Sequence, residues 1–184
     1  VARGDNAQAE SLAERQLAAM PTPLESGPWV DDLRRAGANA YLRDGRLQDA
    51  ESMLRPTVAT RLAALAGANI NKQRSNARYF LLYAQILDSL GRREQVAPLI
   101  APTRAFIQAE GVAVNAHPQR HLQLAQAYLT IALASDGEER RKALAAASHH
   151  VRLVPANVAG LRAARDVIGL LESAVARSGR SSSA

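Results

Sequence analysis

The sequence contains no cysteine, and this absence excludes several kinds of chemistry. Without thiols the chain has no disulfide framework, no cysteine nucleophile and no cysteine ligand for zinc. The absence of cysteine leaves the redox compartment open, and we favour a cytoplasmic location with the periplasm as the alternative.

Long apolar runs are missing as well. No stretch approaches the ~20 consecutive apolar residues that a transmembrane helix needs, so we predict no membrane span. Residues 1–4 also lack the apolar segment of a signal peptide. Since the chain does not begin with methionine, we expect that it follows an upstream domain in a longer protein.

Aromatic residues make up only 4% of the 184 residues, although 47% are hydrophobic. The core must therefore consist mainly of alanine, leucine, valine and isoleucine, and small side chains suit closely packed helices. The length is that of one ordinary domain with a real core. Apart from Lys72 and Lys142 the 23 basic residues are arginines. This bias is typical of GC-rich bacterial genomes, so we expect a bacterial protein.

The formal net charge of +6 and the isoelectric point near 10.4 permit binding to nucleic acid, an anionic membrane face or an acidic peptide. The basic residues nevertheless alternate with acidic ones, as in residues 31–35 and 138–142. Mixed runs of this kind usually form solvated helix faces. We therefore favour that interpretation over a dedicated anion-binding surface.

Strand signals are nearly absent, whereas the three- and four-residue spacing of apolar residues that marks an amphipathic helix recurs throughout. Between residues 79 and 90 this spacing is carried by Tyr79, Tyr83, Ile86, Leu87 and Leu90. Turn-forming glycines and prolines divide the chain into about eight helices joined mostly by short turns. We predict an all-α fold.

One internal comparison is specific. Residues 45–57 align without gaps on residues 91–103, with a Gly-Arg pair at the start and a Pro-Thr pair at the end of both segments. In front of each segment, a small residue is followed three positions later by a large one. These residues are Ala38 and Tyr41 in the first segment and Ala84 and Leu87 in the second. The chain therefore contains a repeated helix pair.

These residues resemble the tetratricopeptide repeat, in which a small residue and an aromatic on the first helix meet a small residue on the second. Matching residues continue at Ala125, Tyr128, Ala143 and Pro155. The resemblance implies a right-handed superhelical array of antiparallel helix pairs, which stack because one short pair cannot bury its apolar face alone. The repeats are degenerate, since their turn glycines lie further apart than the family's ~34 residues.

Two prolines depart from the family pattern. Pro56 and Pro102 fall inside the second helices of the first two pairs. Each removes a backbone hydrogen bond, so we expect both helices to kink or break there.

The repeats and turns divide the chain into four parts. Residues 1–27 are expected to hold the second helix of a truncated first repeat and a linker, and residues 28–155 three degenerate helix pairs. Residues 156–178 carry one apolar and one polar face, as a C-terminal capping helix requires. Residues 179–184 are polar, and we expect a disordered tail. This organisation predicts the C-terminal part of a larger regulatory or signalling protein.

The histidines are the residues most able to transfer protons or bind metals near neutral pH. His149 and His150 are adjacent, so on a helix they point roughly 100° apart and cannot chelate one ion. His117 and His121 are four residues apart, but Pro118 disfavours a continuous helical turn from residue 117. We therefore predict no metal site. No phosphate loop, nucleophile elbow or other catalytic signature is present, so we predict no cofactor, no catalytic residue and no enzymatic activity.

The family resemblance implies that the first helices of successive pairs line a concave face, which in the family commonly holds an extended peptide. Amide side chains stand two residues before the large residue of each first helix, at positions 41, 87 and 128. They are Asn39, Gln85 and Gln126. Because an amide both donates and accepts hydrogen bonds, this row could pair with the main chain of a peptide.

Basic residues extend this candidate site. Arg35, one turn before Asn39, resembles the basic residue beside an asparagine in carboxylate-binding members of the family, and Arg78 would approach from the next repeat. Gln123 completes the set of candidates. The carboxylate-binding members have further basic and asparagine residues, but this sequence has Leu82, Gln119 and Gln123 at those positions. A chain-terminal carboxylate is therefore not the predicted ligand.

We therefore predict a scaffold module that binds a protein or peptide segment on its concave face. The alternative is a basic helical array that binds nucleic acid or another polyanion through its arginines. Nucleic acid is the less favoured partner, because tetratricopeptide-like sequences offer no base-reading element. One tryptophan and two phenylalanines also leave little for base stacking.

Overall fold

The computed structural model describes residues 8, 11–16, 27–65, 69–111, 118–154, 157 and 162–181. These residues are helical apart from short turns and contain no strand, which confirms the all-α prediction. The elements are α2 (Pro28–Arg43), α3 (Leu47–Ala63), α4 (Ile70–Ser89), the 3-10 helix η1 (Arg93–Val96), α5 (Ala97–Gly111), α6 (Pro118–Ala134), α7 (Gly137–Arg152) and α9 (Arg162–Ser181). None of the described helices is both long and apolar enough to cross a membrane.

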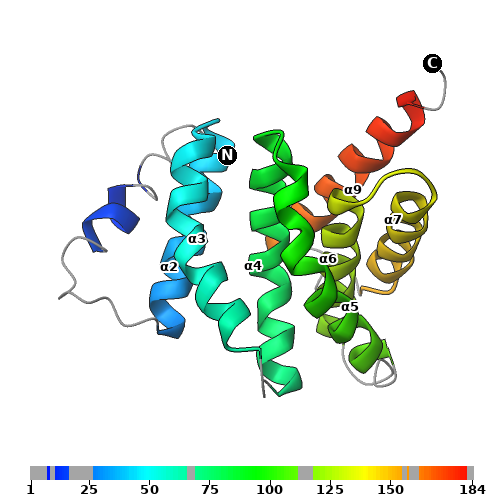
Figure 1. Ribbon diagram of the computed structural model, residues 1–184, viewed down its shortest axis with the longest axis horizontal. Coiled ribbons are helices and arrows are strands. Elements are labelled where there is room, and N and C mark those ends of the chain that lie inside the picture. The colour runs from blue at the N-terminus through cyan, green and yellow to red at the C-terminus, as the bar shows by residue number, and fades with distance from the viewer. Residues whose placement is uncertain are drawn as a thin grey trace.

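The helices pack on one another largely in the order of the chain, as Figure 1 shows. α2 contacts α3, α4 contacts η1 and α5, and α6 contacts α7, so each predicted pair consists of packed neighbours. α4 in addition contacts both α2 and α6. The three helices that were predicted to line a common face are therefore adjacent in space.

The same turn follows the first helix of both aligned segments. Gly45 and Gly91 have φ of 78° and 71°, a left-handed conformation in which a side chain would be strained. The turn lets the Arg46 N–H donate to the carbonyl of Tyr41 at 2.9 Å, and the corresponding bond to the carbonyl of Leu87 is 2.8 Å. Bonds of this kind satisfy the last carbonyls of a helix. The sequence alignment thus corresponds to a local structure that occurs twice.

Small buried residues let the helices approach closely. Ala38 of α2, Ala84 of α4 and Ala125 of α6 are the predicted small residues of the three first helices, and each is completely buried. Most buried side chains form one apolar cluster that runs from Ala38 to Ala174 and so includes α9. At roughly 25 cal/mol per Å² of apolar surface removed from water, this cluster is the main favourable contribution to folding.

Neither Pro56 nor Pro102 ends its helix, so of the two predicted outcomes, a kink or a break, the break does not occur. α3 continues through Pro56 to Ala63, although it changes direction along its length in Figure 1. Pro102 lies within α5. Around Pro56 the side chains of Leu54 and Val58 are buried, and this packing compensates for the missing backbone hydrogen bond.

The last described helix continues three residues beyond the predicted end of the cap at residue 178. α9 begins at Arg162 and continues to Ser181, so it includes residues 179–181, which were predicted to be a disordered tail. Residues 182–184 lie outside the described residues. α9 packs on α6 and α7. Its buried apolar stripe consists of Ala164, Val167, Leu171 and Ala174.

A helical segment, residues 11–16, packs against α2. Its Ala13 is completely buried, and a Cβ added at Gly37 would lie 3.1 Å from the Ala13 Cβ, so glycine permits this close approach. The Tyr41 hydroxyl donates a hydrogen bond to Glu14. The rest of the predicted half-repeat in residues 1–27 lies almost wholly outside the described residues.

Candidate functional site

Five of the six predicted partner-binding residues line one hollow of about 300 Å³. They are Arg35 and Asn39 of α2, Arg78 and Gln85 of α4, and Gln126 of α6. Leu42 and Leu82 add apolar surface, and α9 supplies the remaining wall. The volume is at the lower end of the range for ligand pockets. We refer to this cavity as the groove hollow.

Helix periodicity explains why these side chains share the groove hollow. Arg35, Asn39 and Arg43 stand four residues apart on α2, so they lie above one another on one face. Arg78 and Gln85 are separated by two turns of α4 and share a face for the same reason. Because α4 contacts both α2 and α6, the side chains on these faces of α2 and α4 meet Gln126 of α6.

Three side-chain amides in the groove hollow are available to a ligand. In the described part of the chain, those of Asn39, Gln85 and Gln126 form no hydrogen bond with another residue. Asn39 and Gln85 are partly exposed, and 9% of the surface of Gln126 is exposed to solvent. Amides that face a hollow without an internal partner can each donate to and accept from a bound molecule.

Asp32 holds the two arginines beside the groove hollow. Its Oδ1 lies 3.3 Å from Arg35 Nε and 3.0 Å from an Arg78 guanidinium nitrogen, and it accepts a hydrogen bond from the Tyr79 hydroxyl at 2.9 Å. Burial raises the pKa of Asp32, but the Tyr79 hydrogen bond and the two arginine charges outweigh it and hold the pKa below its usual value. Burial and the bond to Asp32 raise the pKa of Tyr79. At neutral pH Asp32 is therefore an acceptor and Tyr79 a donor.

The neighbouring Asp31 is buried and binds Arg61 of α3. Its Oδ2 lies 2.8 Å from an Arg61 guanidinium nitrogen, and its Oδ1 accepts from the Thr57 hydroxyl at 3.0 Å. Arg61 also donates to the Asn76 side chain at 2.8 Å. The prediction that residues 31–35 form a solvated face is therefore wrong for Asp31, because its counter-charge comes from another helix.

The sixth predicted residue, Gln123, does not line the groove hollow. Its Oε1 atom is buried and has no hydrogen-bond partner within the described residues. The structure therefore does not bring Gln123 together with the other five predicted residues.

The sequence-based prediction missed Arg43 and the wall that α9 forms. Arg43 stands one turn after Asn39, so the spacing that selected Arg35 could also have selected Arg43. Asp166 of α9 meets Arg43 through both carboxylate oxygens, at 3.2 and 3.1 Å from the same guanidinium nitrogen. The two residues are 123 positions apart, and no sequence signal indicated that they meet.

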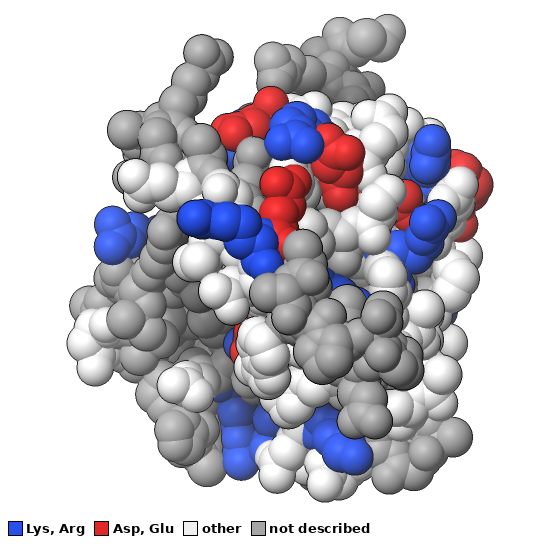
Figure 2. Space-filling model, turned by 90° about the vertical axis from the view of Figure 1, so that its left-hand side faces the viewer, with Lys and Arg blue, Asp and Glu red and all other residues white. Residues whose placement is uncertain are grey.

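Acidic and basic side chains are intermingled on the face of the molecule that Figure 2 shows. Elsewhere in the described residues exposed charges also form pairs. Arg93 lies 2.7 Å from Asp136, and Lys142 lies 2.8 Å from Glu138. Residues 138–142 are mostly exposed, which confirms the prediction of a solvated face there.

No protein-family model matches the chain, and neither a curated protein nor a solved structure matches it. Functional assignment therefore depends on the chemistry of the groove hollow, which brings together three arginines, one aspartate and three amides.

Proposed function

We propose that the chain is a tetratricopeptide-like interaction module, a right-handed superhelical array of antiparallel helix pairs that binds a protein segment on its concave face. One observation carries the proposal. Polar residues chosen only for their repeat position, on α2, α4 and α6, line a single cavity. α9 would act as the cap of the last pair and also as one wall of the groove.

The groove hollow suits a short extended segment that carries an acidic side chain. Its three amides can bond to peptide main-chain groups whatever the sequence. Arg35 and Arg78 share one carboxylate, Asp32, so the arginine pair retains positive charge for a carboxylate of the ligand. A volume of about 300 Å³ admits a short stretch of peptide but no folded domain.

Binding of nucleic acid or another polyanion has less support. An arginine already paired with an acidic side chain releases fewer counterions from a bound polyanion. Arg74 and Arg120 both pair with Glu110, and Arg93 with Asp88 and Asp136. We expect retention of a labelled oligonucleotide to be weak even at low salt.

A peptide-display selection with the intact chain tests the proposal. We expect enrichment of short acidic peptides, whose affinities are then measured by titration with the synthetic peptide. The double variant Asn39→Ala/Gln85→Ala should bind about tenfold more weakly, because each lost hydrogen bond contributes about 0.5–1.5 kcal/mol. Its thermal unfolding should change little, since neither amide has a hydrogen-bond partner among the residues that the structure describes.

A matched control separates the groove hollow from the general surface. Gln48 is an exposed amide on α3 that lies outside the groove hollow, so Gln48→Ala should bind the peptide as the wild type does. Asp166→Asn removes the carboxylate that competes for Arg43, and acidic peptides should then bind more tightly. Equal loss in both alanine variants, or failure to enrich any acidic peptide, would reject the proposed function.

A further inference from the structure

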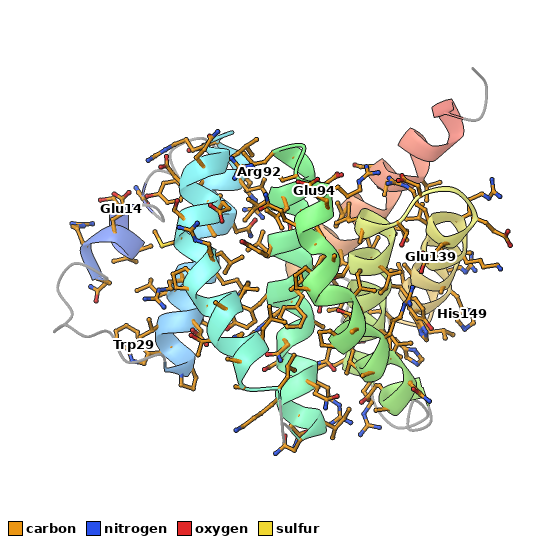
Figure 3. All side chains as sticks on the ribbon, in the orientation of Figure 1. Glu14, Trp29, Arg92, Glu94, Glu139 and His149 are labelled. Carbon is orange, nitrogen blue, oxygen red and sulfur yellow. The ribbon has the colours of Figure 1, made fainter. Side chains whose placement is uncertain are left out.

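Two histidines from different helices meet where α6 begins and α7 ends. Nδ1 of His121 on α6 lies 3.1 Å from Nδ1 of His150 on α7. Sequence spacing had tested only pairs within one helix, whereas the fold joins residues 29 positions apart. His149, the neighbour of His150, is exposed, and Figure 3 labels it at the outer edge of the molecule beside α7.

The distance between the two nitrogens matches the spacing of two ligands on one metal ion. Imidazole nitrogens bind Zn²⁺ at about 2.0–2.1 Å. Two such nitrogens lie roughly 2.9 Å apart when their bonds meet at a right angle and roughly 3.3 Å apart at the tetrahedral angle. The separation of 3.1 Å falls between these values. The ring centroids are 5.4 Å apart, so the two Nδ1 atoms face each other along one line, and each ring has to turn to direct its lone pair at a shared ion.

Each ring must offer an Nδ1 lone pair to such an ion. In the hydrogen-bonded pair, one neutral ring carries its proton on Nδ1 and the other accepts it. Ion binding shifts that proton to Nε2 of the same ring, so the number of bound protons is unchanged.

The surroundings orient one of the rings and limit the number of protein ligands. The Tyr128 ring stacks on His150, with centroids 5.6 Å apart and planes 15° apart, and this contact limits how far the imidazole can tilt as it turns. Within the described residues, no group of three or more His, Asp or Glu side chains could hold an ion. Water would therefore complete the coordination, and Mg²⁺, which prefers oxygen ligands, is a poor match.

We propose that His121 and His150 form a two-histidine site for a divalent transition-metal ion, with Cu²⁺ bound most tightly. Imidazole suits copper, nickel and zinc, and affinity at a given nitrogen site generally peaks at Cu²⁺. The ion would join the start of α6 to the end of α7. This site is separate from the groove hollow and does not depend on peptide binding there.

Calorimetric titration of the untagged chain with CuCl₂, ZnCl₂ and MgCl₂ tests the site. We expect one Cu²⁺ per chain, weaker binding of Zn²⁺ and no binding of Mg²⁺. His121→Gln and His150→Gln should each weaken Cu²⁺ binding by on the order of tenfold or more, because only one protein ligand remains. His149→Gln should leave the affinity unchanged. Cu²⁺ should also raise the midpoint of thermal unfolding of the wild type by several degrees.

A second measurement needs no variant. Substoichiometric Cu²⁺ should broaden the NMR signals of the His121 and His150 rings before those of the other histidines, because a paramagnetic ion relaxes its own ligands most strongly. Stoichiometric Cu²⁺ binding that survives the double variant His121→Gln/His150→Gln would overturn the proposal. So would an equal loss of affinity on replacing His149.

Discussion

The guanidinium of Arg61 lies over the ring of Tyr79, with its Cζ atom 3.7 Å from the ring centroid. Both residues are also bound to α2, since Arg61 pairs with Asp31 and the Tyr79 hydroxyl donates to Asp32. The stacked pair therefore joins α3 and α4 to the start of α2. It fixes the helices that carry Arg35 and Arg78 relative to each other.

Arg61→Leu should destabilise the chain by about 2–4 kcal/mol, because it leaves the carboxylate of Asp31 buried without a counter-charge. Urea unfolding followed by circular dichroism measures the effect. Lys142→Leu is the matched control: its partner Glu138 is exposed, and such pairs contribute roughly 0.3–0.5 kcal/mol. A similar shift in the two variants would show that the Asp31–Arg61 pair is not the stabilising element.

Glu110 is completely buried at the end of α5 and joins that helix to two others. Arg74 of α4 donates to its Oε2 at 2.9 Å, and Arg120 of α6 lies 3.2 Å from Oε1 in a charge contact without hydrogen-bond geometry. Glu110→Gln keeps the shape but leaves both arginines without their carboxylate, so we expect a loss of about 2–4 kcal/mol.

The control for Glu110 is Glu139, an exposed residue that pairs with Arg104 and is labelled in Figure 3. Glu139→Gln should change the stability by less than about 1 kcal/mol. Hydrogen exchange shows where the structure opens, since Glu110→Gln should accelerate the exchange of backbone amides more in α5 than in α2. Uniform acceleration along the chain would contradict a local role for Glu110.

The pH dependence of stability should report on Asp32. Its pKa is lower in the folded chain than the value of 3.8 for an unperturbed carboxyl, so the ionised form stabilises the fold. This contribution is complete well above pH 3.8 and is lost as the pH falls through the folded pKa. The difference in thermal midpoint between the wild type and Asp32→Asn should therefore be constant near neutral pH and vanish in strong acid.

Tyr79→Phe provides an independent test of the same carboxyl. Without the hydroxyl donor the pKa of Asp32 should rise, as measured by carboxyl carbon NMR. The acid loss of stability should then begin at a higher pH than in the wild type. An unchanged Asp32 titration in this variant would mean that the arginine charges alone set its pKa.

Two glycine-to-alanine replacements should change the free energy of unfolding in opposite directions. Gly91 has a positive φ, so Gly91→Ala should cost about 1–2 kcal/mol through backbone strain. Gly169 lies inside α9, where an added Cβ meets nothing within 4 Å, and Gly169→Ala should stabilise by about 0.5–1 kcal/mol. Differential scanning calorimetry measures both. Destabilisation by Gly169→Ala would contradict the prediction that an alanine fits at this position of α9.

Local signals in the sequence were sufficient to predict the helices, the turns and the residues of α2, α4 and α6 that line the groove hollow. A small residue at Ala38 and a large one at Tyr41 recur at Ala84 and Leu87, and this spacing depends only on the helical period. The row of three amides was found from the same repeated positions, one on each helix. Such features can be read from sequence because each is determined within one or two turns of helix.

Contacts between helices could not be predicted in the same way. Asp31 looks like one member of a mixed surface run until Arg61 is placed against it. The adjacency of His149 and His150 concealed the contact between His150 and His121, which depends on how closely α6 and α7 pack. Side-chain pairs of this kind are set by interhelical distances, for which a single sequence contains no direct signal.

The ion pair between Arg43 and Asp166 has a consequence for folding. In a linear series of helix pairs, each pair touches only its neighbours, so one end can open while the rest stays folded. Here the last described helix touches the first pair, and Val167 belongs to the same apolar cluster as Tyr41. Opening at either end therefore disrupts contacts at the other. The described helices should unfold in one cooperative transition, and refolding should be slowed by the entropy of closing so long a loop.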